Sequence, residues 1–181
     1  MERFLSLDFI EMTEKTKLKN YLIIFVLMIS FNKMNSQNSL STLLNKYNTG
    51  NSPYISVEEL RMHQLNDEVV ILDARELDEF EVSHLQDAIF VGYNYFDESK
   101  IQNIPKDKRI VVYCSIGIRS ENIAKRIMNA GFKDVHNLYG GIFEWKNEDF
   151  PVVDSTGKET EKVHVYSKRW GKWLENGKKI Y

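Results

Sequence analysis

Cysteine is almost missing from this 181-residue chain, which contains one, Cys114. A single cysteine excludes an intrachain disulfide framework, and it excludes a metal site built from several thiolates. The four histidines are His63, His84, His136 and His164, and no two of them stand at the i, i+4 spacing of helical metal ligands. The sequence therefore predicts a protein without a metal site.

A strong net charge is missing as well. Lys and Arg number 24 and Asp and Glu number 26, for a net charge of −2, which excludes a general nucleic-acid binder. With 43% hydrophobic and 28% charged residues, the composition is globular. The charge is uneven: residues 37–155 hold 12 Lys/Arg against 19 Asp/Glu, and residues 156–181 hold seven against three. A basic C-terminal segment thus follows an acidic main part.

A hydrophobic run long enough to cross a bilayer, which takes about 20 residues, is also missing. The most apolar stretch is YLIIFVLMISF, Tyr21–Phe31, and it follows three lysines, Lys15, Lys17 and Lys19. Basic residues before a short apolar run are typical of a signal peptide. We predict a signal peptide over residues 1–36, and export of the mature chain, most simply to the periplasm, with no stable membrane insertion after cleavage.

Some features of this segment leave alternatives open. The acidic residues Glu2, Asp8 and Glu11 are unusual before a signal sequence, so Met12 is an alternative start. A buried core helix or an uncleaved anchor would also explain the apolar run. In an oxidising compartment cysteines are usually paired, so a lone thiol is expected either to be buried or to have a chemical role.

Beyond a polar lead-in over residues 37–55, strand and helix signals alternate. The expected helices are a segment opened by the capping box Ser56-x-x-Glu59 with Leu60 and Leu65 on its apolar side, residues 76–83 with Leu77 and Phe80 on one face, and residues 120–130. The expected strands are residues 69–72, 88–91, 110–113 and 134–138. Fully apolar strands between amphipathic helices predict an α/β fold with a mainly parallel central sheet flanked by helices on both faces.

The chemistry is expected at Cys114, between the strand 110–113 and the following helix. Ligands of parallel sheets bind at this carboxyl edge, and the helix N-terminus there stabilises a thiolate and lowers its pKa. Gly117 allows the loop to curl so that its N–H groups form an anion cradle, and Arg119 adds a positive charge. The loop predicts a nucleophilic sulfur inside an anion site. The alternative is that Cys114 is a buried core thiol.

Residues 56–153 resemble a single rhodanese-like domain. The matching stretches are Leu72-Asp73-Ala74-Arg75-Glu76, Glu79-Phe80, His84-Leu85, Ala88-Ile89, the segment from Val111 to Ser120 with its CxxGxRS loop, Leu138-Tyr139-Gly140-Gly141, and Trp145. The resemblance implies a rhodanese fold and a sulfurtransferase in which Cys114 carries a transient persulfide without any other cofactor. It implies an anion-cradle loop of Ser115, Ile116, Gly117, Ile118, Arg119 and Ser120. It also implies that Asp73 and Arg75 support the loop, for which a strand-end cap with a structural salt bridge is an equal alternative.

The sequence departs from the family pattern around His84, where Ser83 and Asp87 replace two glycines. The loop also has Ile116 and Ile118 and lacks a second basic residue, so the resemblance does not by itself imply efficient use of the doubly charged thiosulfate. The expected partners are small sulfur donors, either thiosulfate, a polysulfide or a persulfide, with thiols or cyanide as acceptors. No nucleic-acid partner is expected.

Two other functions stay open at this point. Four residues separate Cys114 from Arg119, whereas the related phosphatase arrangement has five and makes a wider ring for a tetrahedral oxyanion. A phosphatase or arsenate-reductase-like enzyme is therefore the less favoured chemistry. A catalytically idle rhodanese-like binding module is the other alternative, although such modules usually lack the cysteine.

The C-terminal extension, residues 154–181, is basic and aromatic. It contains Trp170 and Trp173, which are three residues apart and so share a helical face, more typical of a docking face than of a ligand site. We expect a short strand at residues 163–166 and a helical turn at 169–174. The segment is too apolar for a free tail, and we predict that it packs back onto the domain.

Overall fold

The computed structural model describes residues 17–25 and 40–181, and the chain divides into two units, residues 1–43 and 44–181. In the first unit, residues 17–25 are helical, and the apolar side chains from Tyr21 to Phe25 are exposed. The rest of the predicted signal peptide and its cleavage point lie outside the described residues, so export stays a prediction. Among the helices that the structure describes, none is long and apolar enough to span a membrane.

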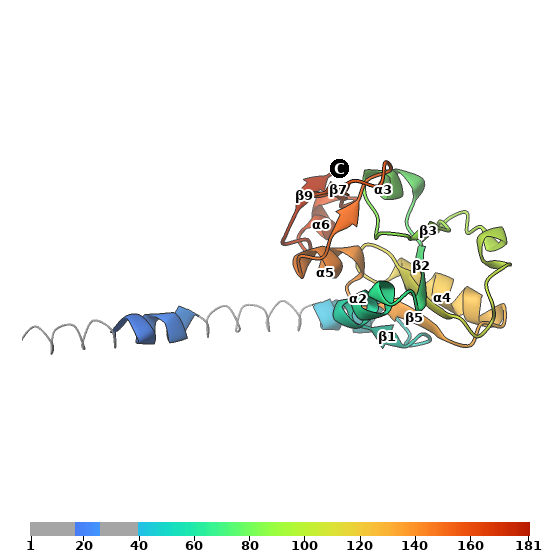
Figure 1. Cartoon of the computed structure of the whole chain (residues 1–181), viewed down its shortest axis with the longest axis horizontal. Helices are drawn as coiled ribbons and strands as arrows, with labels where there is room; N and C mark the ends of the chain where they lie inside the picture. Colours follow the sequence, from blue (N-terminus) through green and yellow to red (C-terminus); the bar gives the residue numbers. More distant parts are fainter. Residues whose placement is uncertain (1–16, 26–39) are drawn as a thin grey trace, which may run out of the picture. The chain divides into compact units, whose positions relative to one another are not determined.

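The second unit is built on a five-stranded sheet in the order β1-β5-β4-β2-β3, with every neighbouring pair parallel (Figure 1). The strands are β1 (Tyr54–Ile55), β2 (Val69–Asp73), β3 (Ile89–Phe90), β4 (Arg109–Tyr113) and β5 (Val135–Leu138). The predicted α/β fold with a parallel sheet is confirmed. The register aligns Asp73 with Tyr113, so β2 and β4 end side by side at the edge where Cys114 follows.

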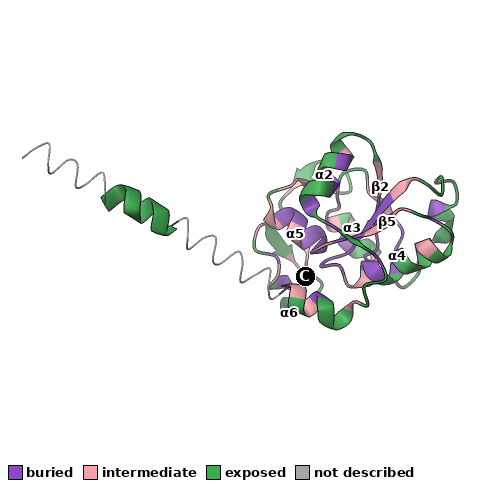
Figure 2. Ribbon diagram, turned by 90° about the horizontal axis from the view of Figure 1, so that it is seen from below, coloured by how far each residue is buried: buried purple, intermediate pink, exposed green. Residues whose placement is uncertain are grey.

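The helices of this unit connect the strands. Up to residue 147 they are α2 (Val57–Leu65), α3 (Leu77–Val82), the 3-10 helix η1 (Glu98–Ile101), α4 (Arg119–Asn129) and α5 (Gly141–Asn147). Residues 40–47, which include the boundary between the two units, are also helical. Figure 2 shows α5 as largely buried, whereas α4 is buried along one side and exposed along the other. The amphipathic sequence of α4 therefore covers the sheet, and α5 lies inside the domain.

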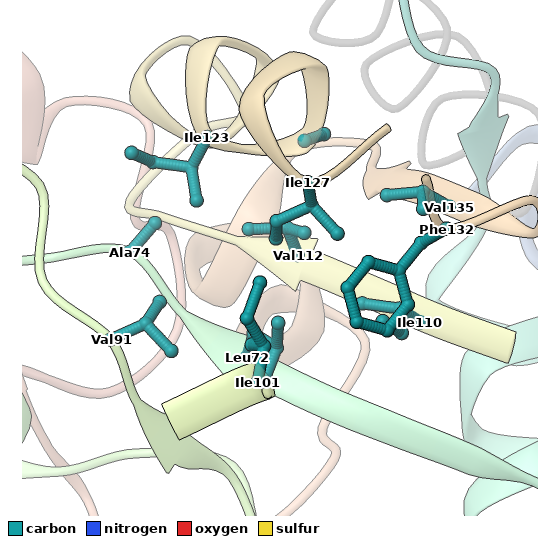
Figure 3. Packing of buried hydrophobic residues seen from close by; sticks show 11 residues of the cluster. Leu72, Ala74, Val91, Ile101, Ile110, Val112, Ile123, Ile127, Phe132 and Val135 are labelled. Atoms are coloured by element: carbon teal, nitrogen blue, oxygen red, sulfur yellow. The ribbon is translucent and has the colours of Figure 1, made fainter. Parts of the chain in front are cut away.

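The core on the α4 side of the sheet is aliphatic. Leu72, Ile110 and Val112 alternate along β2 and β4 and pack with Ile123 and Ile127 of α4 (Figure 3). Successive strand residues point to opposite faces, so the buried Ile71, Val111 and Tyr113 face the other side, where α2 contacts β2 and α5. Because both faces are covered, these strands read as continuous apolar runs.

Two details of the helix predictions were wrong. In α2, Ser56 caps the helix by accepting from the Glu59 N–H at 3.2 Å as expected, but Leu65 is 67% exposed and His63 is buried in its place. The buried face of α2 is Val57, Leu60 and His63, which follows the i, i+3 spacing.

The second wrong detail concerns α3, where Leu77 is 53% exposed and Glu79 is fully buried. A helix of six residues presents little surface to the core, and here the acidic residue faces inward. The reason lies in the loop that follows β4, which supplies the partners of that carboxylate.

The C-terminal extension adds two small sheets. β6 (Val152–Val153) pairs antiparallel with β7 (Glu159–Thr160), and β8 (Lys162–His164) pairs in parallel with β9 (Lys178–Ile180), with α6 (Lys168–Gly171) between the last two. β8 contacts α3. Val163, Val165 and Leu174 are fully buried, so apolar side chains of the extension are shielded from solvent.

Candidate active site

Cys114 lies directly after β4, and α4 begins at Arg119, one residue earlier than expected. The thiol is only 1% exposed, and its Sγ accepts a hydrogen bond from the Gly117 N–H at 3.2 Å. The Ser120 hydroxyl lies 3.4 Å from the same sulfur and 2.7 Å from Asn137 Oδ1. In the loop of residues 114–120, the Gly117 N–H and the Ser120 hydroxyl thus face the sulfur, and the wider anion cradle over residues 115–119 stays a prediction.

The curl of the loop depends on Gly117, whose φ of 100° lies in the region that favours glycine. A Cβ at this position would lie 3.1 Å from the carbonyl oxygen of Leu138. The Gly117 carbonyl accepts from the side-chain amides of Asn137 and Asn48, each at 2.8 Å. These two asparagines hold the turn from segments distant in sequence, and sequence reasoning did not identify either of them.

Burial and polarity oppose one another at the Cys114 thiol. Burial raises the pKa of the thiol, but the charge of Arg119 and the hydrogen bonds from Ser120 and the Gly117 N–H outweigh it, so the net pKa is lowered. A lowered pKa increases the fraction of thiolate, which is the nucleophilic form of cysteine. The lowered pKa therefore favours a reactive thiol over the alternative of an inert core thiol.

Arg119 forms a two-pronged ion pair with Glu79 of α3. Nη1 and Nη2 of Arg119 each donate to the carboxylate at 2.7 Å, and Nη2 also donates to the Ser115 hydroxyl at 3.0 Å. Burial raises the pKa of Glu79, but the bonds and charge of Arg119 reverse the effect and hold it below its usual value. The positive charge that Arg119 adds to the loop is thus paired with a buried carboxylate.

Glu79 was missed as a site residue by sequence reasoning. It also accepts from the Ser115 hydroxyl at 3.1 Å, so it ties both ends of the loop to α3. Its position three residues after Glu76 was a local signal, because the Glu79 carboxylate also accepts from the Glu76 N–H in the manner of a helix N-terminal box. The contact with the loop, 40 residues away, had no such signal.

Asp73 and Arg75 form a separate, fully buried ion pair. Nη2 of Arg75 lies 2.6 Å from Asp73 Oδ2 and donates to the Ser83 carbonyl at 2.6 Å. The Tyr113 hydroxyl donates to Asp73 and accepts from the Leu85 N–H at 3.2 Å. The pair thus holds the end of β2 and the segment after α3. Its hydrogen-bond link toward the loop runs through Tyr113, the residue before Cys114, and the charge of Arg75 also acts on Glu79 and Arg119.

The two glycine replacements near this network have different outcomes. Asp87 has a φ of 62°, so it adopts the left-handed conformation that a glycine would adopt more easily. Ser83 is fully buried at the end of α3 with extended backbone, and its carbonyl is the one that accepts from Arg75. The local turn is therefore present in spite of both replacements.

The N-terminus of α5 donates backbone hydrogen bonds to the first two residues of the loop. The Ile142 N–H donates to the Cys114 carbonyl at 2.9 Å, and the Phe143 N–H donates to the Ser115 carbonyl at 3.1 Å. This approach requires Gly141, because a Cβ there would lie 2.2 Å from the Cys114 carbonyl oxygen. The Gly140-Gly141 pair is therefore part of the site's support.

A cavity of about 280 Å³ opens over the loop. It is lined by Glu76, Tyr93, Asn94, Cys114, Ser115, Ile116, Ile118, Arg119, Tyr166 and Trp170. Of the cradle residues, Ser115, Ile116, Ile118 and Arg119 line the cavity, whereas Gly117 and Ser120 do not. Tyr166 and Trp170 come from the C-terminal extension, and sequence reasoning did not place either of them at this site.

The described residues contain no group of three or more His, Cys, Asp or Glu side chains placed to hold a metal ion. The histidines have other contacts: His63 with Glu68, His84 stacked on Phe80, His136 with Asp134, and His164 with the Tyr166 N–H.

The model of the rhodanese-like domain family matches residues 56–148. The chain belongs to the rhodanese-like domain family. This agrees with the CxxGxRS loop and with the parallel sheet, and it relates the chain to proteins of sulfur transfer.

The curated proteins that are similar in sequence to this chain include sulfurtransferases and tRNA hydroxylases. The chain is 34% identical over 79 residues to the thiosulfate sulfurtransferase GlpE of Coxiella burnetii, covering 44% of this chain and 73% of that protein. It is 37% identical over 102 residues to a tRNA uridine(34) hydroxylase of Listeria welshimeri, covering 53% of this chain but only 32% of that protein. The chain thus spans about a third of the hydroxylase.

Solved structures show the same fold. The rhodanese-like domain of an Anabaena protein has a TM-score of 0.52 at 21% identity, covering 56% of this chain and 79% of that one. A thiosulfate sulfurtransferase from Pseudomonas aeruginosa has a TM-score of 0.52 at 24% identity, covering 59% of this chain and 21% of that one. These likenesses confirm the rhodanese-like fold.

Proposed function

We propose that this rhodanese-like protein is a sulfurtransferase that moves sulfane sulfur from a donor to a thiol or cyanide through a persulfide on Cys114. The observation that carries the proposal is a thiol that lines a cavity, follows a parallel strand and accepts a hydrogen bond from the Gly117 N–H; the lowered pKa of this thiol agrees with it. A thiolate serves both half-reactions, because it attacks in the first and leaves in the second.

In the first half-reaction, the Cys114 thiolate attacks the outer sulfur of the donor. A bond forms between Sγ and that sulfur, and the sulfur–sulfur bond of the donor breaks; its electron pair leaves with sulfite from thiosulfate or with a thiolate from a persulfide. The outer sulfur of the new persulfide carries the negative charge, and the loop N–H groups over residues 115–119 would hold it.

In the second half-reaction, an acceptor thiolate or cyanide attacks the outer sulfur. The persulfide bond breaks and its electron pair returns to Cys114, which regenerates the starting thiolate. The acceptor gains one sulfur atom, so no external oxidant or reductant is needed. The chain's residues supply an attacking group, an anion cradle and a good leaving group.

Intact mass spectrometry tests the proposal. We expect thiosulfate, a polysulfide or an organic persulfide to add one sulfur atom to the protein, and cyanide to remove it as thiocyanate. Cys114→Ser should abolish the adduct, whereas Ser99→Ala on η1 should retain it. Absence of the adduct with every donor, together with hydrolysis of an aryl phosphate or reduction of arsenate, would contradict the proposal and favour the phosphatase-like chemistry.

If none of these reactions occurs, the protein is better explained as a binding module. The retained thiolate would then have no turnover, and capture of a partner from the exported fraction becomes the informative measurement. The compartment is tested separately, by the N-terminal sequence of the mature protein after fractionation. A chain that begins near Gln37 in the periplasmic fraction is expected.

A further inference from the structure

The C-terminal extension forms one wall of the cavity over Cys114. Tyr166 and Trp170 line the cavity together with Tyr93, Ile116 and Ile118. The Tyr166 ring centroid lies 5.7 Å from the guanidinium carbon of Arg119, within the range of a cation–π contact. Residues of the extension thus lie next to the reactive thiol.

The backbone at Tyr166 is held in an uncommon conformation. Its φ of 59° lies in the left-handed region, which bulky side chains rarely adopt. The Tyr166 N–H donates to His164 Nδ1 at 3.1 Å, and Val165 before it is fully buried. The flanking contacts determine this backbone turn and direct the ring, which is 63% exposed, to the rim of the cavity.

The extension is anchored independently of the cavity. Lys146 of α5, only 6% exposed, pairs with Glu161 at 2.8 Å. The Asn147 amide donates to the Trp173 carbonyl at 2.9 Å, and the Asn147 side-chain oxygen accepts from the Glu175 N–H at 2.7 Å. These contacts lie on both sides of Tyr166 and Trp170 in sequence, so the wall is held at both ends.

The cavity offers little to a doubly charged donor. Of the described residues that line it, Arg119 is the one cation, and Glu79 already pairs with it at 2.7 Å. A carboxylate, Glu76, also lines the cavity and accepts from the Asn94 N–H at 3.3 Å. The sulfonate of thiosulfate would therefore face aromatic and aliphatic side chains and a carboxylate.

We propose that Tyr166 and Trp170 bind the carbon body of a low-molecular-weight organic sulfur donor, an aromatic or aliphatic persulfide or thiosulfonate, in preference to thiosulfate. This inference rests on the proposed sulfurtransferase function. Five of the lining side chains are aromatic or aliphatic, and an apolar cavity with a few polar groups at the reacting atom is typical of a small-molecule site. The volume of about 280 Å³ suits a small molecule.

The transfer step is the same for such donors. The Cys114 thiolate attacks the outer sulfur of a thiosulfonate, the bond from that sulfur to the sulfonyl group breaks, and the electron pair leaves on a sulfinate. For a persulfide the leaving group is a thiolate. In both, the charge at the leaving group is one unit, and the carbon body lies against the aromatic wall.

Two matched probes test the inference in the full-length protein. Benzenethiosulfonate and methanethiosulfonate have the same reactive group and the same single charge, and they differ only in the carbon body. We expect kcat/KM for loading of Cys114 to be about tenfold higher with benzenethiosulfonate than with methanethiosulfonate, which corresponds to a difference of about 1.4 kcal/mol in free energy. Both should react faster than thiosulfate.

Variants assign that preference to the wall. Tyr166→Ala and Trp170→Ala should each reduce the benzene-to-methane ratio at least about threefold, and intrinsic donor reactivity cancels in that comparison. Tyr95→Ala is the matched control, because Tyr95 is 91% exposed and does not line the cavity. Tyr166→Arg should raise the rate with thiosulfate relative to methanethiosulfonate, and it covers the case in which Trp170→Ala fails to fold.

The outcomes are distinguishable. If no probe loads Cys114, the proposed function itself fails, and this inference fails with it. If thiosulfate and both thiosulfonates load Cys114 at similar rates, or if the ratio is the same in Tyr166→Ala, Trp170→Ala and Tyr95→Ala, the sulfurtransferase proposal survives. The extension then has no role in donor selection.

Discussion

Cys114 is a residue on which burial and charge act in opposite directions. A thiol that is 1% exposed would ordinarily be neutral, yet Arg119, Ser120 and the Gly117 N–H lower its pKa. The cost of burying the thiolate is therefore offset by groups within seven residues of one loop. This balance makes the ionisation of Cys114 sensitive to single substitutions around it.

The pH dependence of sulfur loading tests the balance. The thiolate exists above its pKa, so the loading rate should fall as pH decreases through a midpoint below about 8.5, the ordinary cysteine value. Ser120→Ala removes a hydroxyl donor to Sγ, and the midpoint should move upward by roughly half a pH unit. Loading by methanethiosulfonate against pH is the measurement. A midpoint unchanged from the wild type in Ser120→Ala, or one above 9, would contradict this account; Ser99→Ala is the control.

An arginine that only added charge to the anion loop would matter more for turnover than for folding. The structure gives a different expectation, because Arg119→Ala would leave the fully buried Glu79 carboxylate without its partner. Removing one member of a buried ion pair costs about 3 kcal/mol or more. We therefore expect Arg119→Ala to lower both the free energy of unfolding and the rate of loading.

A double-variant cycle in urea separates the two effects. Glu79→Ala should also destabilise, and the pair Glu79→Ala with Arg119→Ala should cost at least about 1 kcal/mol less than the sum of the single changes. The surface pair of Arg126 and Glu98, at 3.2 Å and half-exposed, is the matched control and should give a coupling near zero. Additive costs at Glu79 and Arg119 would show that their contact contributes nothing.

At the scale of elements, the site is a junction of β4, α4, α3 and α5. β4 places Cys114 at the sheet edge, and α4 begins at the loop's arginine. α3 contributes Glu79, and α5 donates two N–H groups to the carbonyls of Cys114 and Ser115. The loop is thus held by side-chain contacts from α3 and by backbone hydrogen bonds from α5.

The contact of α5 with the loop gives a prediction at Gly141. Gly141→Ala would bring a Cβ to 2.2 Å from the Cys114 carbonyl oxygen, so the loop or the helix must move. We expect a loss of about 3 kcal/mol or more in the free energy of unfolding, with slower sulfur loading. Urea unfolding and loading kinetics are the measurements.

The matched control for this change is Gly131→Ala. Gly131 also has a positive φ, 94°, but nothing lies within 4 Å of the position of its Cβ. It should therefore show only the conformational cost of about 1–2 kcal/mol and normal loading. Equal effects of the two substitutions on loading would mean that the close approach of α5 is not needed at the site.

At the scale of the whole molecule, the C-terminal extension makes several contacts with the rhodanese-like domain. β6 and β7 pair across the start of the extension, β8 contacts α3, and Lys146 pairs with Glu161. The net basic charge of residues 156–181 follows the net acidic charge of residues 37–155. The extension is therefore expected to contribute to stability as well as to the cavity.

Truncation after Asp154 tests that contribution. It removes the buried Val163, Val165 and Leu174 together with the partner of Lys146, and it exposes the surfaces that they cover. We expect the melting temperature to fall by about 6 °C or more, corresponding to about 2 kcal/mol for a domain of this size. Removal of Tyr181 alone, which is 64% exposed, should have little effect. An unchanged melting temperature after truncation would show that the extension is dispensable for folding.

The sequence by itself determined the features that depend on neighbouring residues. Strand, cysteine, glycine, arginine and helix follow one another within residues 110–130, so the thiol at a helix start and the parallel α/β fold could both be predicted. The apolar alternation of Ile110 and Val112 and the spacing of Ile123 and Ile127 are equally local. Such patterns express the geometry of one strand or one helix, which is the same in any fold.

Only the tertiary structure decided which distant groups complete the site. Glu79 meets Arg119 across 40 residues, Asn137 meets Gly117 across 20, and Tyr166 and Trp170 reach the cavity from the extension. No periodicity or residue spacing in the sequence indicates these contacts, because each depends on how separate elements pack. The sequence could therefore indicate the nucleophile, whereas the pairing of its nearby charge and the aromatic wall over it are consequences of packing.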